Sequence, residues 1–570
     1  MRNPRALLPP RRRRTAALLC VLAAAAVRAD MRLLATVETD SYRSFTLGAA
    51  AFCQAAGMPL TLADLDARAA DVLLVPGMAG VDPQAHLWIC WLMGDETNRL
   101  ERSTVAVAIL PTADNGAGAL QVLGAAYPQR TKAGDGPLWR YARPAASNRT
   151  EAVVFATVRN GCVVASLSRA AVAWVAGRPL PRPTAATTAI AGQVRVTFVP
   201  VALAALLKAA REQRPEGRTD DVNDALERML GDVDTLSLVL ETATDGATLR
   251  LQLAPAAGSP LSGLTARLRP PAAGFWRLPP AGATLAAASG GITLWDVVRT
   301  YGATNRPAAA RAAPQPLSAI LDGDSLLYVA RTESAGQIYF AAVQGTTDAE
   351  AAWRQAQAAP RALLPFAPSF AIRTNGWRDA NGIRILDLVF GDSRSADPAA
   401  ATNNPVDITA FMLHDGGMSV ATNAGRLVYT IGPSNAIAEV LARLRAPAPD
   451  GPSLPTRCRT LLPNAADDAC SLLLLQPVAL LRQIAESLPN IRAERLAMLP
   501  EPGAGIAASV RRAPDGSLQV ALRVSSDELS RAQVVLNEGR AALQEMFMQM
   551  AVQQLLQRTG APDPRRTRSR

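Results

Sequence analysis

Side chains that commonly carry out catalysis are few in this sequence. It contains two histidines, His86 and His414, and two lysines, Lys132 and Lys208. Neither histidine has a second one at the spacing of a helical turn or a hairpin, which a metal site would require. We therefore expect both histidines to be structural or surface residues, and we predict no metal site.

Motifs of known catalytic sites are absent as well, since no G-x-S-x-G, S-x-x-K or H-E-x-x-H occurs. Asn115–Gly118 has two glycines of a phosphate-binding loop, but position 121 is Gln where the dinucleotide fingerprint needs a third glycine. Paired aspartates can hold a cation or act as an acid–base pair, but in turns they usually form local hydrogen bonds. The pairs here lie in turn-like contexts: Asp232/Asp234, Asp322/Asp324 and Asp467/Asp468. We predict no catalytic residue and no cofactor.

The net charge of +11 does not indicate a surface for nucleic acid. Seven arginines lie in the first 28 residues and four in the last six, so the remaining chain sums to 11 − 7 − 4 = 0. A phosphate backbone is bound by basic residues that cluster on the folded surface. We therefore expect no nucleic-acid partner.

The first arginines belong to an expected secretory signal peptide. Arg11–Arg14 form a basic region, Thr15–Val27 an apolar stretch, and Val27–Ala29 a small-residue cleavage pattern. The apolar stretch is shorter than the roughly 20 residues of a membrane-spanning helix, and no later segment has that pattern. We expect residues 1–29 to be cleaved near Ala29 and the mature protein to be periplasmic or secreted. The alternative is a leader that is retained as an anchor.

Export would place the remaining cysteines in an oxidising compartment. Cys458 and Cys470 are separated by a short loop, and we predict a disulfide between them. The pairing of Cys53, Cys90 and Cys162 stays open, and an odd total leaves at least one thiol unpaired.

The chain uses one stretch twice. Gln193–Ala209 and Ala469–Glu486 each contain an apolar run, the tetrapeptide Pro-Val-Ala-Leu and the pattern of an amphipathic helix. Further landmarks recur in the same order: the prolines are 477 − 200 = 277 residues apart, two hairpin glycines 425 − 161 = 264, and two Asp-Gly turns 515 − 245 = 270. This constancy predicts an internal repeat of about 250–270 residues.

Hairpins interspersed with helices predict an α+β protein of two tandem homologous units, each with mainly antiparallel sheets and packed helices. Proline-rich linkers suggest two lobes per unit: residues 30–177 and 193–268, then 277–445 and 469–558. Ser525 and Glu528 have the form of a capping box that opens a long C-terminal helix. Residues 559–570 are expected to be a disordered basic tail.

The leader, the apolar strands, the Pro-Val-Ala-Leu elements and the Asp-Gly hairpins together resemble large bacterial exported envelope proteins whose domains have no assigned function. The resemblance spans most of residues 31–550 and implies no catalytic residue. The sequence favours a non-catalytic binding or scaffold protein of the cell envelope, whose partner is an envelope protein or an apolar ligand. The alternatives are an apolar-ligand or lipid carrier and a hydrolase with two facing carboxylates. The oligomeric state stays open.

Overall fold

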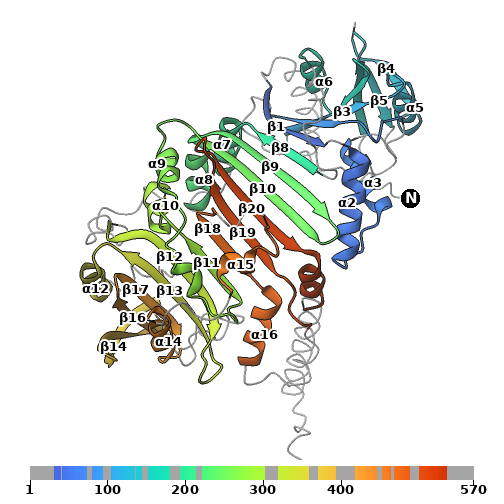
Figure 1. Cartoon of the computed structure of the whole chain (residues 1–570). Helices are drawn as coiled ribbons and strands as arrows, with labels where there is room; N and C mark the ends of the chain where they lie inside the picture. The colour runs from blue at the N-terminus through green and yellow to red at the C-terminus, as the bar shows by residue number, and fades with distance from the viewer. Residues whose placement is uncertain are drawn as a thin grey trace, which may run out of the picture.

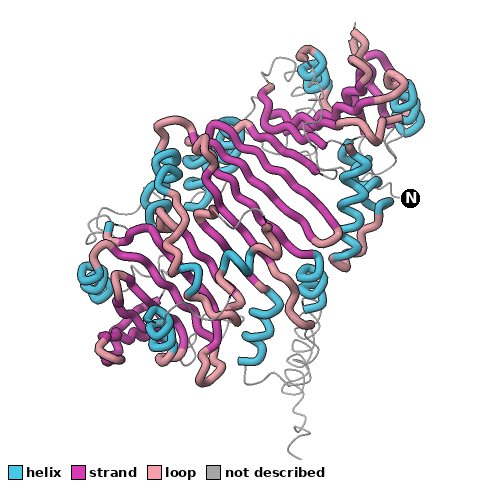
Figure 2. Tube along the Cα trace, viewed as in Figure 1, coloured by secondary structure: helices cyan, strands magenta, loops and turns pink. Residues whose placement is uncertain are grey.

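The described residues fold as an α+β protein built on one large antiparallel sheet of twenty strands, with helices packed against it (Figures 1 and 2). The computed structural model describes residues 31–39, 41–73, 80–93, 104–134, 136–143, 152–179, 193–212, 221–301, 319–358, 370–392, 417–445, 452–463, 468–487 and 500–535. The predicted α+β class and the mainly antiparallel pairing are confirmed.

The strands of the first half are β1 (Arg32–Thr39), β2 (Leu87–Met93), β3 (Thr104–Pro111), β4 (Gln129–Lys132), β5 (Trp139–Arg143), β6 (Ala152–Arg159), β7 (Cys162–Ser166), β8 (Gln193–Phe198), β9 (Val233–Ala243) and β10 (Gly246–Pro255). Those of the second half are β11 (Leu285–Ser289), β12 (Leu321–Arg331), β13 (Ile338–Thr346), β14 (Phe370–Ala380), β15 (Ile383–Asp392), β16 (Gly417–Asn423), β17 (Arg426–Gly432), β18 (Ser471–Leu475), β19 (Ile506–Arg512) and β20 (Leu518–Ser525).

The helices are α2 (Tyr42–Ala55), α3 (Leu62–Leu73), α5 (Ala117–Ala126), α6 (Arg169–Ala176), α7 (Pro200–Glu212), α8 (Asp221–Gly231), α9 (Pro260–Arg267), α10 (Leu294–Tyr301), α12 (Ala349–Ala358), α14 (Ala436–Arg445), α15 (Leu454–Cys458) and α16 (Pro477–Ser487), with a 3-10 turn η2 (Phe275–Arg277). None of the helices in the described ranges is long and apolar enough to cross a membrane.

A single order of pairings runs through the sheet, and β10 and β20 pair at its centre. Outward from β10 the order is β9, β8, β1, β2, β3, β7, β6, β5 and β4. Outward from β20 it is β19, β18, β11, β12, β13, β17, β16, β15 and β14. The two orders correspond strand for strand. Because β1 pairs with β8 and β11 with β18, the strands of the predicted lobes belong to one sheet.

Local sequence signals account for the hairpins and the helix starts. Asn160 and Gly161, between β6 and β7, have φ angles of 52° and 75°, which a tight hairpin turn requires. Pro200 and Pro477 are the first residues of α7 and α16, where a missing N–H leaves no hydrogen bond unmade. The strand–proline–helix junction predicted from the repeated tetrapeptide is thus present at both places.

The central strands have two different faces, because successive side chains point to opposite sides of a strand. On one face Phe198, Leu236 and Leu253 pack with side chains of α7, α8 and α9. The opposite face is covered at its two ends, by α6 over a cluster that contains Trp88 and by α14 and α15 over a cluster that contains Leu472. Between these ends the same face carries polar side chains.

The chain ends fall largely outside the described residues, and so do the predicted signal peptide and basic tail. Residues 526–535 are helical, at the place where the predicted long C-terminal helix would begin, and the rest of that prediction falls outside the described residues. The buried carboxylate of Glu528 accepts hydrogen bonds from the backbone N–H groups of Val478 and Gly503, so it joins this helix to other segments.

Candidate functional site

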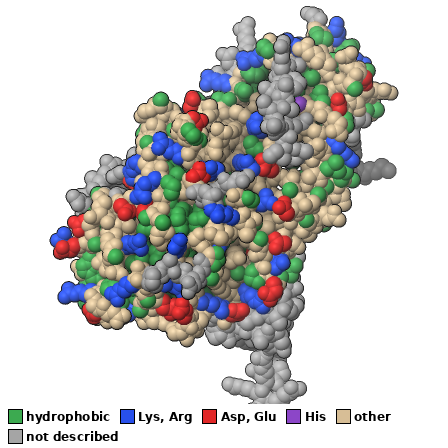
Figure 3. Space-filling model, viewed as in Figure 1, with side chains coloured by type: hydrophobic (Ala, Val, Ile, Leu, Met, Phe, Trp, Pro, Cys, Tyr) green, Lys and Arg blue, Asp and Glu red, His purple; other side chains and the backbone are tan. Residues whose placement is uncertain are grey.

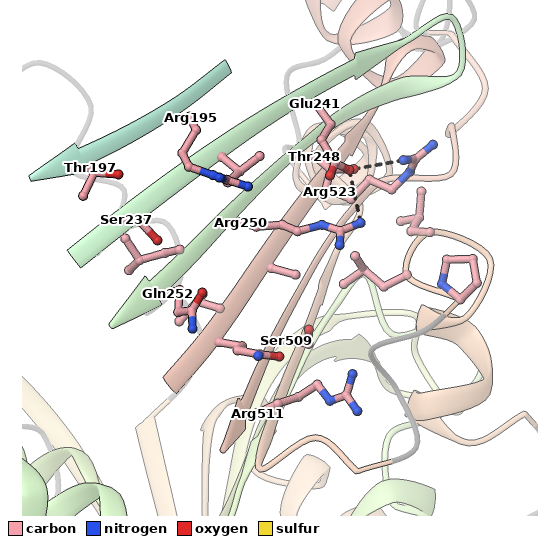
Figure 4. A pocket seen from close by; sticks show the side chains of 18 residues that line it. Arg195, Thr197, Ser237, Glu241, Thr248, Arg250, Gln252, Ser509, Arg511 and Arg523 are labelled. Atoms are coloured by element: carbon pink, nitrogen blue, oxygen red, sulfur yellow. Dashed lines mark hydrogen bonds and ion pairs between the residues drawn. The ribbon is translucent and has the colours of Figure 1, made fainter. Parts of the chain in front are cut away.

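A groove of about 610 Å³ lies on the polar face of the central sheet, where its two halves meet. Its floor comes from β8, β9, β10, β20 and β19 (Figure 4). One row of paired residues crosses these strands and consists of Arg195, Val239, Arg250, Ala521 and Ser509. Because valine and alanine are short, they leave space between the longer side chains of the row.

Four arginines line the groove: Arg195, Arg250, Arg511 and Arg523. Arg195 lies 3.4 Å from the carboxylate of Glu38, and Arg250 lies 3.1 Å from that of Glu241. Arg511 pairs with Asp468, and Arg523 pairs with Asp245. Each guanidinium is therefore held in place by one carboxylate.

The carboxylates do not cancel the positive charge within the groove. Among its described lining residues only Glu241 is acidic, and Glu38, which is 25% exposed, pairs with Arg195 from outside the lining, so the four arginines and these two glutamates carry 4 − 2 = +2 charges. Asp245 and Asp468 are mostly exposed, and water and salt screen their interactions. The groove thus favours an anionic group.

Ser509 is the residue of the groove that most clearly lacks a partner. Its side chain is 1% exposed, and its hydroxyl oxygen has no hydrogen-bond partner in the described structure. Buried polar atoms are nearly always paired, and leaving one unpaired costs about 1–3 kcal/mol. A polar group bound in the groove would give this hydroxyl a hydrogen-bond partner.

The end of the groove beyond β19 is apolar. Leu461, Leu462 and Pro463, which follow α15, line it there, and the two leucines are buried. Ser509 pairs in register with Leu472 of β18, which belongs to the same core cluster as Leu461 and Leu462. The groove therefore has arginines on β8, β10, β20 and β19 and an apolar wall formed by the residues that follow α15.

The repeated stretch explains why the groove lies on one half of this face. Counted back from Pro200 and Pro477, Arg195 corresponds to Leu472 and Thr197 to Leu474. Leu472 and Leu474 are buried in the cluster under α15, whereas Arg195 and Thr197 are exposed and line the groove. Two polar-for-apolar exchanges thus distinguish an open polar face from a covered core.

The residues considered from the sequence lie elsewhere and have structural partners. His86 lies 3.6 Å from Glu38, and its ring stacks near that of Trp88, while His414 falls outside the described residues. Asp232 accepts a hydrogen bond from the Tyr301 hydroxyl. Asp322 accepts one from the backbone of Asp324, which pairs with Arg269 at 2.7 Å. Of the third pair, Asp468 binds Arg511, and Asp467 is outside the described residues.

The Asn115–Gly118 loop is occupied by its own chain. The Asp114 carboxylate accepts hydrogen bonds from the N–H groups of Gly116 and Gly118, at 3.0 and 2.6 Å. A phosphate would need these same donors. No group of three or more metal-ligating side chains occurs within the described residues.

The disulfide predicted between Cys458 and Cys470 is not formed in the structure, where both are buried free thiols. The Cys458 sulfur lies 3.9 Å from the carbonyl oxygen of Leu473, and Cys470 lies three residues before it along the chain. At the rise of about 3.3 Å per residue of a strand, that separation is roughly 10 Å, too far for a disulfide. Closeness in sequence was misleading. Cys458 packs beside Leu473, in the middle of β18, whereas Cys470 lies just before the first residue of that strand.

Alkylation should find the five cysteines of the described residues to be free thiols. Burial raises the pKa of the Cys458 thiol to about 12 and that of Cys90 to about 11, so both should stay protonated and react slowly in the native protein. In denaturant without reductant, we expect the mass to rise by one adduct for each of Cys53, Cys90, Cys162, Cys458 and Cys470. A deficit of two adducts that reductant restores would instead show a disulfide.

The groove residues were not recognised from the sequence, although a signal was present. In β8, Gln193, Arg195 and Thr197 alternate with apolar residues, and the same alternation recurs in β10. Alternation predicts a strand with one polar face, but it is the same for any face that meets water. The special position of these residues follows from the lateral pairing of five strands.

No family model matches this chain, and neither does any curated protein or solved structure.

Proposed function

We propose that this protein is a non-catalytic binding protein of the bacterial cell envelope that holds an anionic partner in the central groove. The observation that carries the proposal is the joint presence of four arginines and the buried, unpartnered hydroxyl of Ser509 in one groove. Guanidinium groups bind carboxylates and phosphates through two parallel hydrogen bonds. The expected signal peptide supports a periplasmic or secreted location.

The charges of the groove weigh against the two alternative functions, a carrier of lipids or other apolar ligands and a carboxylate-dependent hydrolase. An acyl chain laid over Arg195 and Arg250 would remove their remaining N–H donors from water without offering an acceptor, which is costly. A carboxylate-dependent hydrolase needs two acidic groups, one on each side of its substrate. Glu241 is the one acidic residue among the described lining residues, and Gln193 and Arg250 already bind it.

The surface charge also supports a partner other than nucleic acid. Basic and acidic side chains are interspersed over the face seen in Figure 3. Nucleic acid binding depends on a continuous basic surface. The positive charge that the groove offers is local.

The two tandem units expected from the sequence are part of the proposal. The duplication is supported by the matching strand orders on either side of β10 and β20, and by the Pro-Val-Ala-Leu helices that follow β8 and β18. The groove would then lie at the junction of two related units, with Arg250 opposite Ala521 at its centre. An experimental structure in which residues 193–254 and 469–522 differ in strand order would contradict the duplication.

Reversing one groove charge should weaken partner binding strongly. We expect Arg250→Glu to reduce the amount of partner retained by the immobilised protein by more than ~10-fold, the loss typical of one partner in a charged contact. The control is Arg354→Glu on α12. Arg250 and Arg354 each pair with a glutamate, Glu241 and the more exposed Glu350, so both reversals place two negative charges side by side, but only the first does so in the groove.

The measurement is capture from envelope extracts by the full-length protein, followed by mass spectrometry of proteins, glycans and lipids. Molecules retained by the wild type and by Arg354→Glu but lost from Arg250→Glu would support the proposal. If both variants retained everything that the wild type retains, the groove would not be the binding site.

A further inference from the structure

We propose that the groove binds an extended peptide segment of a partner protein, with a carboxylate side chain at Arg250 and an aliphatic side chain against Leu461, Leu462 and Pro463. This inference rests on the proposed function and assigns the class of partner. It draws on the charges of the groove, its hydrogen-bonding groups and the distance between its two ends.

The charged part of the groove calls for a carboxylate. Arg195 and Arg250 are more than half exposed, and each makes one ion pair, with Glu38 and Glu241. A guanidinium has five N–H donors, and a single carboxylate accepts from two of them at most. Both arginines therefore keep donors for a second carboxylate, which an aspartate or glutamate of the partner would supply.

The row of residues next to that of Arg250 and Ser509 suits a peptide backbone. Each peptide unit offers one hydrogen-bond donor and one acceptor. Gln252, Gln519 and Ser237 lie in this neighbouring row, and each amide side chain supplies both a donor and an acceptor. The lining residues that the structure describes include no Trp, Tyr or Phe, on which a nucleobase would stack. A lining that offers both hydrogen-bond donors and acceptors but no aromatic side chain for base stacking favours a peptide over a nucleic acid.

The far end of the groove takes an apolar side chain next to a polar group. Leu461 and Leu462 are buried beside the same face on which Ser509 lies. The Ser509 hydroxyl, which has no partner in the described structure, can donate to a backbone carbonyl of the peptide at this point. An aliphatic side chain there would add apolar contact without leaving a polar group unpaired.

The spacing of the two ends fixes the pattern of the segment. Arg250 and Ser509 lie in one row on β10 and β19, with β20 between them. Two inter-strand spacings place the Cα atoms of Arg250 and Ser509 about 10 Å apart. An extended chain covers this distance in three residues at about 3.3 Å each. The segment should therefore contain Asp or Glu three positions from Leu, Ile or Val, with the chain crossing the strands.

The test uses fluorescence anisotropy with the full-length protein and labelled peptides of otherwise Ser and Thr residues. One peptide carries Glu and Leu three positions apart, a second has Gln in place of Glu, and a third has Glu and Leu adjacent. We expect the first to bind at least ~10-fold more tightly than the second, the worth of one charged hydrogen-bonded pair. Arg250→Gln should remove that preference, whereas Arg354→Gln should preserve it.

Ser509→Ala gives a readout that separates binding from folding. Removing an unpaired buried hydroxyl should leave the thermal midpoint of unfolding unchanged or higher, while peptide affinity falls ~3- to 10-fold through the lost hydrogen bond. Equal affinity of all three peptides, or an unchanged affinity of Ser509→Ala, would overturn the peptide assignment. If no peptide binds but an anionic oligosaccharide binds in a manner that needs Arg250, the peptide inference fails and the anion-binding groove stands. If neither binds, the proposed function fails as well.

Discussion

Replacing Glu528 by alanine is expected to lower the free energy of unfolding by about 3 kcal/mol, because it leaves one buried and one partly buried N–H group without an acceptor. The Glu528 side chain is 1% exposed, and its two oxygens accept from Val478 at 2.9 Å and from Gly503 at 3.0 Å. Val478 lies in the first turn of α16, where the helix dipole also favours a negative charge. This one side chain thus connects the C-terminal helical segment to α16.

Chemical denaturation of three variants would check this expectation. Glu528→Gln retains one acceptor oxygen and should be intermediate between the wild type and Glu528→Ala. Glu501→Ala is the matched control, because its side chain is 81% exposed and its pair with Arg482 lies at the surface. The control should change stability by less than about 0.5 kcal/mol. A Glu528→Ala protein as stable as the control would show that its two hydrogen bonds are not important.

Replacing Gly291 by alanine should cost more than about 3 kcal/mol and can prevent folding, because a close contact adds to an unfavourable backbone angle. Gly291 has a φ of +87°, and a Cβ atom there would stand 1.8 Å from the carbonyl oxygen of Arg267. That oxygen belongs to the end of α9, so it cannot rotate away as a flexible side chain would. The glycine allows α9 to approach the loop between β11 and α10.

Gly336→Ala is the control that separates the contact from the backbone angle. Gly336 also has a positive φ, +63°, but a Cβ atom there would have no neighbour within 4 Å. It should lose only about 1–2 kcal/mol, the usual cost of a left-handed conformation. The difference between the two variants in urea unfolding measures the contact at Gly291. Equal losses would mean that α9 moves away at little cost.

Features that depend on neighbouring residues could be predicted from the sequence. The turn at Asn160 and Gly161 and the helix starts at Pro200 and Pro477 follow from backbone preferences of a few residues. The order of strands and helices, and with it the α+β class, follows from the same local signals. The extent of the C-terminal helix beyond residue 535 lies outside the described residues and stays a prediction.

Features that depend on distant residues could not be predicted in this way. The predicted disulfide was wrong for the structure because the nearness of Cys458 and Cys470 in sequence ignores the direction of β18. The groove was missed because Arg195, Arg250 and Ser509 are each unremarkable in their own strands. They form one row only through the pairing of β8, β9, β10, β20 and β19.

The sequence alone therefore determined the local elements of this protein, their order and the likeness of its two Pro-Val-Ala-Leu stretches, because these depend on φ preferences and on the period of apolar residues. Only the tertiary structure decided which strands became neighbours. Pairing of β10 with β20 joins residues more than 260 positions apart, and the choice among such partners depends on how whole faces pack. Whatever chemistry the groove has is a property of that pairing, since no single segment of the chain contains it.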